Sequence, residues 1–198
     1  MDGIETLLTV CLGIGLSAAC GFRIFVPMLV LSIATRSGHV ELATGFDWIG
    51  STPALITFSV ATVLEIGAYY IPWLDNLLDS IASPVAVVAG TVVTASVLTD
   101  GSPLMQWTMA IIAGGGAAAA VQATTVVTRG ASSAGTGGLG NPVVATAELG
   151  GSLFMSVLSV FLPLLAVGLA VGVVGFAGYK YNSRKNASKT VEPEQLTS

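Results

Sequence analysis

The feature that most constrains this chain is a series of long apolar runs that recur along its 198 residues. Several runs approach or exceed the roughly 20 residues that a helix needs to cross the hydrocarbon core of a membrane. Only 9% of the residues are charged and the mean hydropathy is +0.84, whereas soluble domains carry about a quarter charged residues. A water-soluble surface cannot be built from so few charges, so the sequence predicts an all-α, polytopic transmembrane helical bundle.

Apolar runs bounded by turn signals predict six spans, at about 4–34, 53–72, 77–98, 103–128, 142–160 and 161–180. The first run is longer than a bilayer requires, and Gly21-Phe22-Arg23 with Pro27 interrupts it, so we expect a helix followed by a half-helix. The spans form a transmembrane domain over about 1–181, with halves at about 4–98 and 103–180. The polar segment over about 182–198 lacks apolar periodicity and is predicted to be a disordered tail.

Basic residues predict the orientation, because cytoplasmic flanks are enriched in Lys and Arg. Four of them directly follow the last predicted span: Lys180, Arg184, Lys185 and Lys189. The C-terminus is therefore predicted to be cytoplasmic, and six spans would place the N-terminus there too. The first run lacks the basic residues of an export signal, so we interpret it as a membrane helix.

A weak internal similarity favours two related halves. The segment 60–67 in the second predicted span resembles the segment 144–150 in the fifth when one residue is skipped. If spans one to three repeat as spans four to six, the odd number per copy inverts the second copy. Inverted three-helix repeats with a broken first helix are typical of transporters, where half-helix ends meet a solute near the midplane.

Three ionisable side chains fall inside predicted spans: Arg23, Glu65 and Glu148. Such groups are costly in a membrane, so each needs a partner, a water-filled cavity or a role in transport. We hypothesise that they converge on one polar site between the halves that forms the path of an ion or solute. The alternative is a structural ion pair that locks the bundle, while the second carboxylate snorkels to an interface.

Secondary candidates for the same path are Tyr69, Gln122, Asp75 and Asp79. The two aspartates are four residues apart, which places them on one helical face at the inner membrane surface. They fit a cation-binding or gating face, but acids that cap the start of the third helix explain them with fewer assumptions.

Other motifs carry less chemistry. The glycine-rich segment 132–142 lacks the Lys of a phosphate-binding P-loop, so we interpret it as a hinge or linker. His39 and Glu41 in a predicted loop do not make a metal site, and we expect no cofactor, no metal and no catalytic residue. The small-residue run 114–120 allows close helix packing, which would permit a homo-oligomer, or it lines a narrow pore.

Three groups of residues resemble a known bacterial family. They are Gly21-Phe22-Arg23 followed by Pro27, the series Glu65, Pro72, Asp75, Asp79 and Pro84, and Asn141-Pro142 followed by Glu148. Together they resemble an inner-membrane protein family of unknown function, the domain of unknown function four-one-two-six, over most of the chain. The resemblance implies a small multi-span protein of the bacterial inner membrane and assigns no catalytic residue.

Three functions remain open at this point. The leading one is a transporter or channel for an ion or small solute, because inverted halves and intramembrane acids fit a solute path. The second is a non-catalytic membrane scaffold or assembly factor that works through helix contacts. The third, a lipid-active membrane enzyme, is disfavoured because the sequence offers no clear nucleophile or metal cluster. Nothing in the net charge of −4 indicates nucleic acid as a partner.

Overall fold

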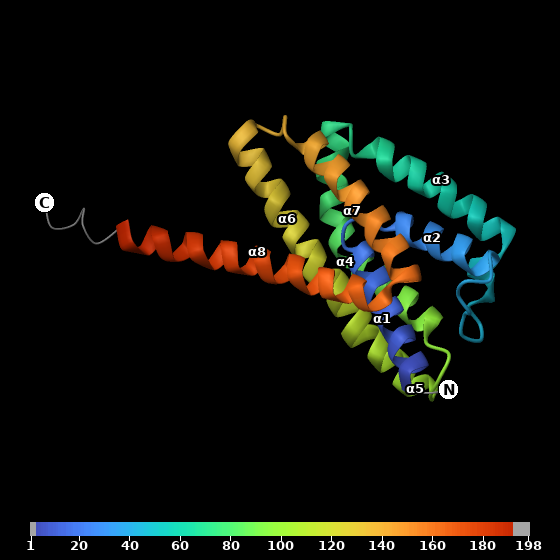
Figure 1. Cartoon of the computed structure of the whole chain (residues 1–198). Coiled ribbons are helices and arrows are strands. Elements are labelled where there is room, and N and C mark those ends of the chain that lie inside the picture. The colour runs from blue at the N-terminus through green and yellow to red at the C-terminus, as the bar shows by residue number, and fades with distance from the viewer. Residues whose placement is uncertain (1–2, 192–198) are drawn as a thin grey trace, which may run out of the picture.

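Figure 1 shows the computed structural model of the chain, a helical bundle from which the last helix projects. The structure describes residues 3–191, without the side chains of 72–80, 181 and 184–191. In chain order the elements are α1 (Gly3–Cys20), α2 (Phe25–Arg36), the 3₁₀ turn η1 (Asp47–Gly50), α3 (Thr52–Ala68), α4 (Pro72–Val97), α5 (Pro103–Met109), the π-helical η2 (Ala110–Gly115), α6 (Gly116–Thr136), α7 (Asn141–Phe161) and α8 (Pro163–Val191). The described residues contain no strand, which confirms the all-α class.

Four helical segments are long and apolar enough to cross a membrane by length and composition: Gly3–Cys20, Pro103–Thr136, Asn141–Phe161 and Pro163–Lys180. Shorter apolar helices lie at Phe25–Arg36, Thr52–Ala68 and Ile81–Val97. Large apolar side chains stay exposed on these helices; Val63, Ile112 and Val171 are 68%, 70% and 68% exposed. An apolar surface of this kind fits a lipid environment, so the structure agrees with membrane embedding.

One end of the bundle, here called end A, gathers the start of α1, the 37–51 loop, the 98–102 loop and the end of α7. Three contacts join these segments: Thr6 Oγ1 donates to Asp100 Oδ2 at 3.3 Å, Ala43 N donates to Ser96 O at 2.7 Å, and the rings of His39 and Phe161 pack edge-on with centroids 5.6 Å apart. End A therefore holds both the beginning of α1 and the loop that follows α2.

The opposite end, end B, holds the α3–α4 and α6–α7 connections. The hydroxyls of Tyr70 and Thr146 lie 2.9 Å apart there and link the end of α3 to the first turns of α7. The glycine-rich segment predicted to be a hinge forms the last turns of α6 and a short turn over 137–140. Gly137 and Gly138 have φ of 62° and 91°, a left-handed backbone that favours glycine.

The helix directions show that α1 and α2 form a hairpin. α1 runs from end A towards end B, and α2 returns to end A, so residues 3–36 do not cross the bundle as one span. The break predicted at Gly21-Phe22-Arg23 is confirmed, because α1 ends at Cys20 and α2 begins at Phe25. The structure differs from the sequence prediction in the direction of α2, which returns to end A and does not continue the crossing begun by α1.

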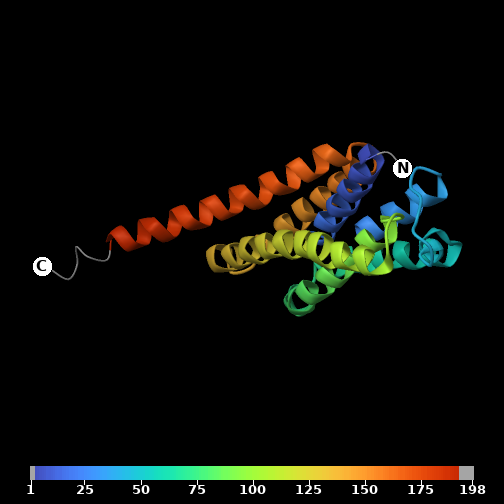
Figure 2. The same cartoon turned by 90° about the horizontal axis from the view of Figure 1, so that it is seen from below.

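The later helices cross between the two ends. α3 and the continuous α5–η2–α6 segment run from end A towards end B, and α4 and α7 run back (Figures 1 and 2). α8 starts after the end of α7 and leads away from the bundle. The N-terminus thus lies at end A, while α8 leads the C-terminus away from it. Six crossings are not confirmed, because α1 and α2 form a hairpin. The inverted repeat is not confirmed either, because the break in the first helix has no matching break within Pro103–Thr136.

α8 is the most exposed of the long helices. Its first half packs along α1, where Ala166 and Ala170 are buried beside Ala18 and Ala19. Beyond that contact it projects from the bundle (Figure 2). It stays helical to Val191, past residue 182, where the disordered tail was predicted to begin. Residues 192–198 lie outside the described residues.

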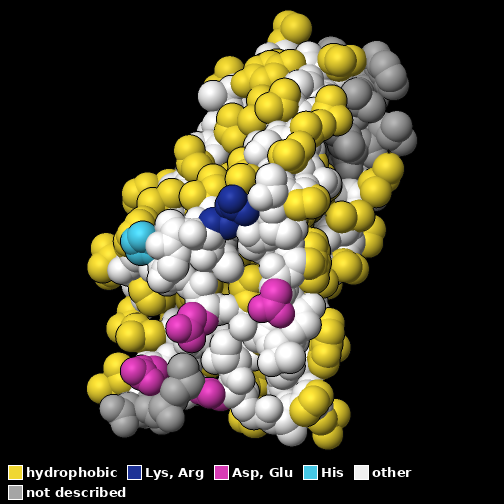
Figure 3. Space-filling model, turned by 90° about the vertical axis from the view of Figure 1, so that its right-hand side faces the viewer, with side chains coloured by type: hydrophobic (Ala, Val, Ile, Leu, Met, Phe, Trp, Pro, Cys, Tyr) yellow, Lys and Arg dark blue, Asp and Glu magenta, His cyan; other side chains and the backbone are white. Residues whose placement is uncertain are grey.

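Acidic side chains outnumber basic ones on the exposed face that includes end A, as Figure 3 shows. The described acids there are Glu5, Glu41, Asp47 and Asp100, and the described arginine beside them is Arg36, the last residue of α2. A groove of about 480 Å³, lined in part by Arg36, Glu41 and Asp47, opens on this end. End A is therefore the acidic end of the bundle.

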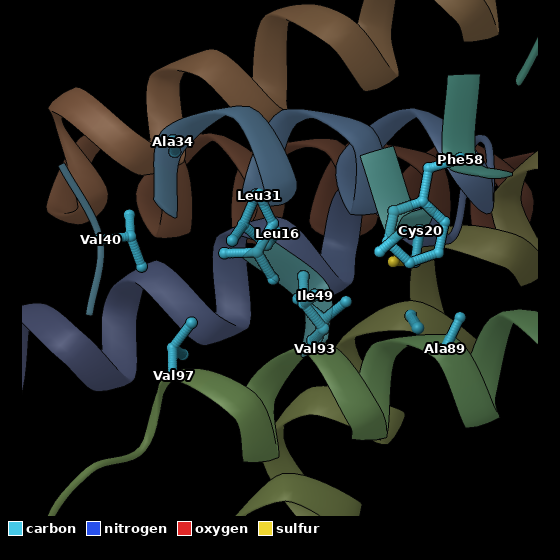
Figure 4. Close-up of a cluster of buried hydrophobic side chains, with 12 residues drawn as sticks. Leu16, Cys20, Leu31, Ala34, Val40, Ile49, Phe58, Ala89, Val93 and Val97 are labelled. Atoms are coloured by element: carbon cyan, nitrogen blue, oxygen red, sulfur yellow. The ribbon is translucent and has the colours of Figure 1, made fainter. Parts of the chain in front are cut away.

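The centre of the bundle is built around α1. Leu16 and Cys20 face one apolar cluster with Leu31, Val93 and Val97 (Figure 4), and the opposite face of α1 meets α6, α7 and α8. Small residues let the helices approach closely, as is usual in membranes, where burial from lipid gives little driving force.

Hydroxyl groups add specific contacts to this close packing. Ser17 Oγ donates to Gly90 O at 2.6 Å and lies 2.7 Å from Thr94 Oγ1. Ser152 Oγ donates to Ala19 O at 3.0 Å. These bonds tie α1 to α4 and α7 and satisfy buried polar groups that cannot reach water.

Gly21 lets the turn of the hairpin approach the backbone of α6 closely. A Cβ at this position would lie 2.6 Å from Ala118 O and 2.9 Å from Gln122 N, both backbone atoms of α6. Because backbone cannot move aside cheaply, Gly21→Ala should destabilise the folded protein by about 1–3 kcal/mol. Thermal unfolding of the purified protein in detergent measures this loss.

Gly168→Ala is the matched control, because Gly168 lies within helix α8 and a Cβ there meets nothing within 4 Å. Alanine is also the better helix former, so this variant should be neutral or slightly more stable. Equal unfolding temperatures for the two variants would contradict the close approach of the hairpin to α6.

Candidate functional site

The turn of the α1–α2 hairpin carries Arg23 into the interior of the bundle. Backbone bonds from Phe22 N and Arg23 N to Ala19 O close this turn, and the Arg23 side chain is 2% exposed. Its Nη2 donates to Ala145 O at 2.8 Å and lies 3.5 Å from Glu148 Oε2. The hairpin tip is thereby joined to the first turns of α7.

Arg129 and Glu148 form the tightest ion pair of the described residues. Arg129 Nε donates to Glu148 Oε1 at 3.0 Å and to Oε2 at 3.1 Å, and Arg129 Nη2 also donates to Oε2. The two residues are equally far from the 137–140 turn, about 10 Å along α6 and α7 at 1.5 Å per residue. The antiparallel helices thus bring them face to face.

Glu65 does not bind either arginine; it binds the start of helix α2. Its Oε1 accepts a hydrogen bond from Ile24 N at 2.8 Å, and its Oε2 accepts one from Phe25 N at 3.1 Å. A carboxylate is favoured at this place because the first amides of a helix lack partners and carry the positive end of the helix dipole. Glu65 therefore holds the returning half of the hairpin against α3.

Tyr69 lies between the two buried arginines. The Cζ atom of Arg23 is 3.7 Å from the centroid of the Tyr69 ring, and that of Arg129 is 4.4 Å from it. The negative face of an aromatic ring attracts a guanidinium, most strongly where water is absent. Tyr69 therefore lets two like charges share one buried region.

These five residues, Arg23, Glu65, Tyr69, Arg129 and Glu148, make up the charge cluster. Each is at most 9% exposed. The cluster joins the hairpin tip to α3, α6 and α7 near end B, and its described charges balance as two arginines against two glutamates. Balance of this kind is what makes such groups tolerable in a membrane.

Hydrogen bonding inside the cluster is incomplete at Arg23. Its Nε and Nη1 atoms are buried and have no hydrogen-bond partner. Leaving a charged donor unsatisfied costs more than leaving a neutral one. Two pockets of the described structure, one beside Arg36 and Asp47 and one beside Thr6 and Asp100, lie at end A, away from the cluster.

The structure places Arg23, Glu65 and Glu148 around the hairpin tip, with Arg23 beside Glu148 and Glu65 at the start of α2. Of the secondary candidates, Tyr69 belongs to the cluster, whereas the backbone of Gln122 packs beside Gly21 at the hairpin turn. Asp75 and Asp79 fall in the first turns of α4, and their side chains lie outside the described residues.

Arg129 is the cluster residue that sequence reasoning missed. It comes directly after the predicted end of the fourth span at residue 128, so the sequence prediction leaves it outside that span. The structure extends this helix to Thr136, which places Arg129 inside it with 4% exposure. Seven residues lie between Arg129 and the 137–140 turn, and seven lie between that turn and Glu148. In two antiparallel helices joined by a turn, residues at equal distances from the turn face each other, and this spacing could have revealed the pair.

Other reactive groups are few in the described part of the chain. Cys11 and Cys20 are free thiols, and both are buried. No group of three His, Cys, Asp or Glu residues among the described side chains is placed to hold a metal ion. The cluster is therefore built for charge and hydrogen bonding, with donors supplied by two guanidinium groups and two backbone amides.

One family matches the chain and contains the whole cluster. The model of the family described as Domain of unknown function (DUF4126) matches residues 10–182. No curated protein and no solved structure matches the chain.

Proposed function

The chain belongs to the family Domain of unknown function (DUF4126), and we propose that it is a small membrane transporter or channel for an ion or small solute. The path passes the charge cluster, where the tip of the α1–α2 hairpin meets α3, α6 and α7. The observation that carries this proposal is Arg23, a cation 98% buried at a break in a helix with two donor atoms unpaired. We propose no enzymatic activity.

The hairpin supports a solute path because it is an irregular backbone segment inside the bundle. Non-helical backbone at membrane depth is tolerated where it is buried in protein or lines a water-filled cavity. In many transporters broken helices point their half-helix ends at the solute. Here the start of α2 and the Arg23 side chain share one such break.

The path is closed in this conformation. Between the hairpin turn and end A, the apolar cluster that includes Leu16, Leu31, Val93 and Val97 is closely packed. Transport then requires the hairpin tip to move. The bonds that hold it are few and polar: Glu65 to the start of α2, and Arg23 to Ala145 and Glu148.

We propose that end B faces the cytoplasm of a bacterium, with the inner membrane as the location. The basic residues of the C-terminal segment support this, and so does the acidic surface of end A, which is typical of an outer face. The C-terminus is then cytoplasmic, as the sequence indicates. The N-terminus lies at end A and is placed outside, which reverses the sequence expectation for it.

Ion flux through purified protein in liposomes tests the proposed function. Vesicles that hold pH-sensitive and ion-sensitive dyes should report flux for at least one ion with the wild type. Arg23→Gln should reduce that flux to the level of empty vesicles, because it removes the buried cation at the break. Glu65→Gln should change the flux, because it weakens the bond that fixes the hairpin.

Arg36→Gln and Glu41→Gln are matched controls, since both residues are exposed at end A and lie outside the cluster. They should retain wild-type flux. Absence of flux for every ion tested, with all variants folded, would contradict the proposal.

That outcome would favour the second candidate, a membrane scaffold or assembly factor. One observation supports it: Arg129 and Glu148 are tightly paired, as expected for a lock between helices. A scaffold should tolerate Glu65→Gln, because the amide preserves shape. A homo-oligomer is compatible with both functions.

A further inference from the structure

We propose that the break between α1 and α2 is a binding site for a small monovalent anion, and that the Glu65 carboxylate occupies it in this structure. This inference rests on the proposed function and names the class of solute: an ion of about the size and charge of a carboxylate, such as chloride or nitrate. The site consists of the first amides of α2 and the guanidinium of Arg23.

The first observation is the way in which Glu65 is bound. Both carboxylate oxygens accept bonds from consecutive backbone amides, Ile24 N and Phe25 N, at the start of a 12-residue helix. Helix starts bind free anions through the same amides and the same dipole. Glu65 comes from a different helix, α3, so its side chain can leave these amides without unfolding α2.

The second observation is Arg23, the residue directly before these amides. Its side chain is 2% exposed, and its Nε and Nη1 atoms make no hydrogen bond. Coulombic attraction also links the charges of Arg23 and Glu65. An anion in place of the carboxylate would receive the two amides. The free Nε and Nη1 donors of Arg23 would turn towards it to pair, because Arg23 forms no ion pair with Glu65 in this conformation.

The charges of the cluster favour an anion over a cation. A cation needs free oxygen ligands, but Glu148 is bound to Arg129 and Arg23, and Glu65 is bound to two amides. If an external monovalent anion replaces the Glu65 carboxylate at the amides, the number of negative charges at the start of α2 stays the same. A divalent anion would add a charge that nothing described in the cluster balances.

Competition between carboxylate and anion sets the expected size of the effect. The apparent affinity of a site is reduced by the fraction of time for which it is open. If Glu65 fills the site at least nine tenths of the time, removing its charge should tighten anion binding by about tenfold or more. Glu65→Gln makes this change with almost the same shape.

The experiment measures nitrate binding to the purified full chain in detergent by titration calorimetry, with gluconate as the anion too large to fit. Glu65→Gln should bind nitrate at least about tenfold more tightly than the wild type. Glu65→Gln/Arg23→Gln should lose this binding, and Glu41→Gln should behave as the wild type. Glu65→Asp, which keeps a carboxylate one methylene shorter, is the second variant if Glu65→Gln does not fold, and should bind nitrate more tightly than the wild type.

Binding and flux separate the two proposals. Equal nitrate affinity in the wild type and in every folded Glu65 variant would overturn the anion site, even if liposomes show cation flux that supports the transporter. Tight nitrate binding that depends on Arg23, without flux of any ion, would support the site and overturn the transport function.

Discussion

Glu148→Gln is expected to destabilise the folded protein by about 3–5 kcal/mol, because it leaves two buried arginines without their shared carboxylate. Glu148 accepts bonds from Nε and Nη2 of Arg129 and lies 3.5 Å from Nη2 of Arg23. A glutamine fills the same space, so the loss reports charge and not packing. In a membrane the freed guanidinium groups have no water to replace the carboxylate.

The measurement is thermal or denaturant unfolding of the purified protein in detergent. Glu41→Gln makes the same chemical change at an exposed position on end A and should shift stability by less than about 0.5 kcal/mol. Arg129→Gln and the double variant complete a mutant cycle, with an expected coupling of about 1–3 kcal/mol between the two residues. A coupling near zero would mean that the pair does not hold α6 and α7 together.

Hydropathy predicted most helices of this fold because span length and apolar content are properties of the local sequence. Five of the six predicted spans correspond to α3, α4, α5–α6, α7 and α8. Most of their ends differ from the prediction by five residues or fewer, but α6 continues to Thr136 and α8 to Val191, eight and eleven residues past the predicted ends. The break in the first run was also readable, since Gly21 and Pro27 are unfavourable in a helix interior.

The direction of α2 could not be read in this way. Hydropathy gives the length of an apolar segment and says nothing about whether the chain turns back. The return of α2 to end A depends on contacts between residues far apart in sequence. Examples are Ala43 N with Ser96 O, and Glu65 with the amides of Ile24 and Phe25.

The sequence indicated several residues of the candidate site, but not the hydrogen bonds that they form. Arg23, Glu65 and Glu148 were chosen because an ionisable side chain inside a membrane span is energetically costly and usually has a partner or a function. The sequence could not show that Glu65 binds backbone amides while Glu148 binds the arginines. Almost every residue type has a backbone amide, so nothing in the sequence marks the start of α2 as the partner of Glu65. Arg129 was missed because the serine and glycine residues after it are typical of a loop, whereas the structure continues α6 to Thr136.

The second large effect concerns the sidedness of the termini, which follows from the hairpin. If α1 begins at end A and α2 returns to end A, the N-terminus and the C-terminal segment lie on opposite sides of the membrane. Labels on the two must then report opposite sides. Six crossings would put both on the same side. The two arrangements therefore differ in an all-or-none signal.

Cysteine labelling in intact cells with a membrane-impermeant maleimide distinguishes them. Cys11 and Cys20 are 7% and 0% exposed, so the wild type should stay unlabelled. Gly3→Cys and Thr44→Cys, both exposed at end A, should be labelled from outside. Leu139→Cys, at a position where leucine is 87% exposed in the turn at end B, should be labelled only after the cells are opened.

Gly3→Cys decides between the arrangements, because Thr44 lies outside and Leu139 inside in both. Labelling of Gly3→Cys in intact cells would place the start of α1 on the same side as the 37–51 loop and make the α1–α2 hairpin re-entrant. Protection of Gly3→Cys until the cells are opened, with Thr44→Cys labelled, would mean that residues 3–36 cross the membrane. Arg23 would then lie within a segment that crosses the membrane, and the break at residues 21–24 would not be the tip of a hairpin.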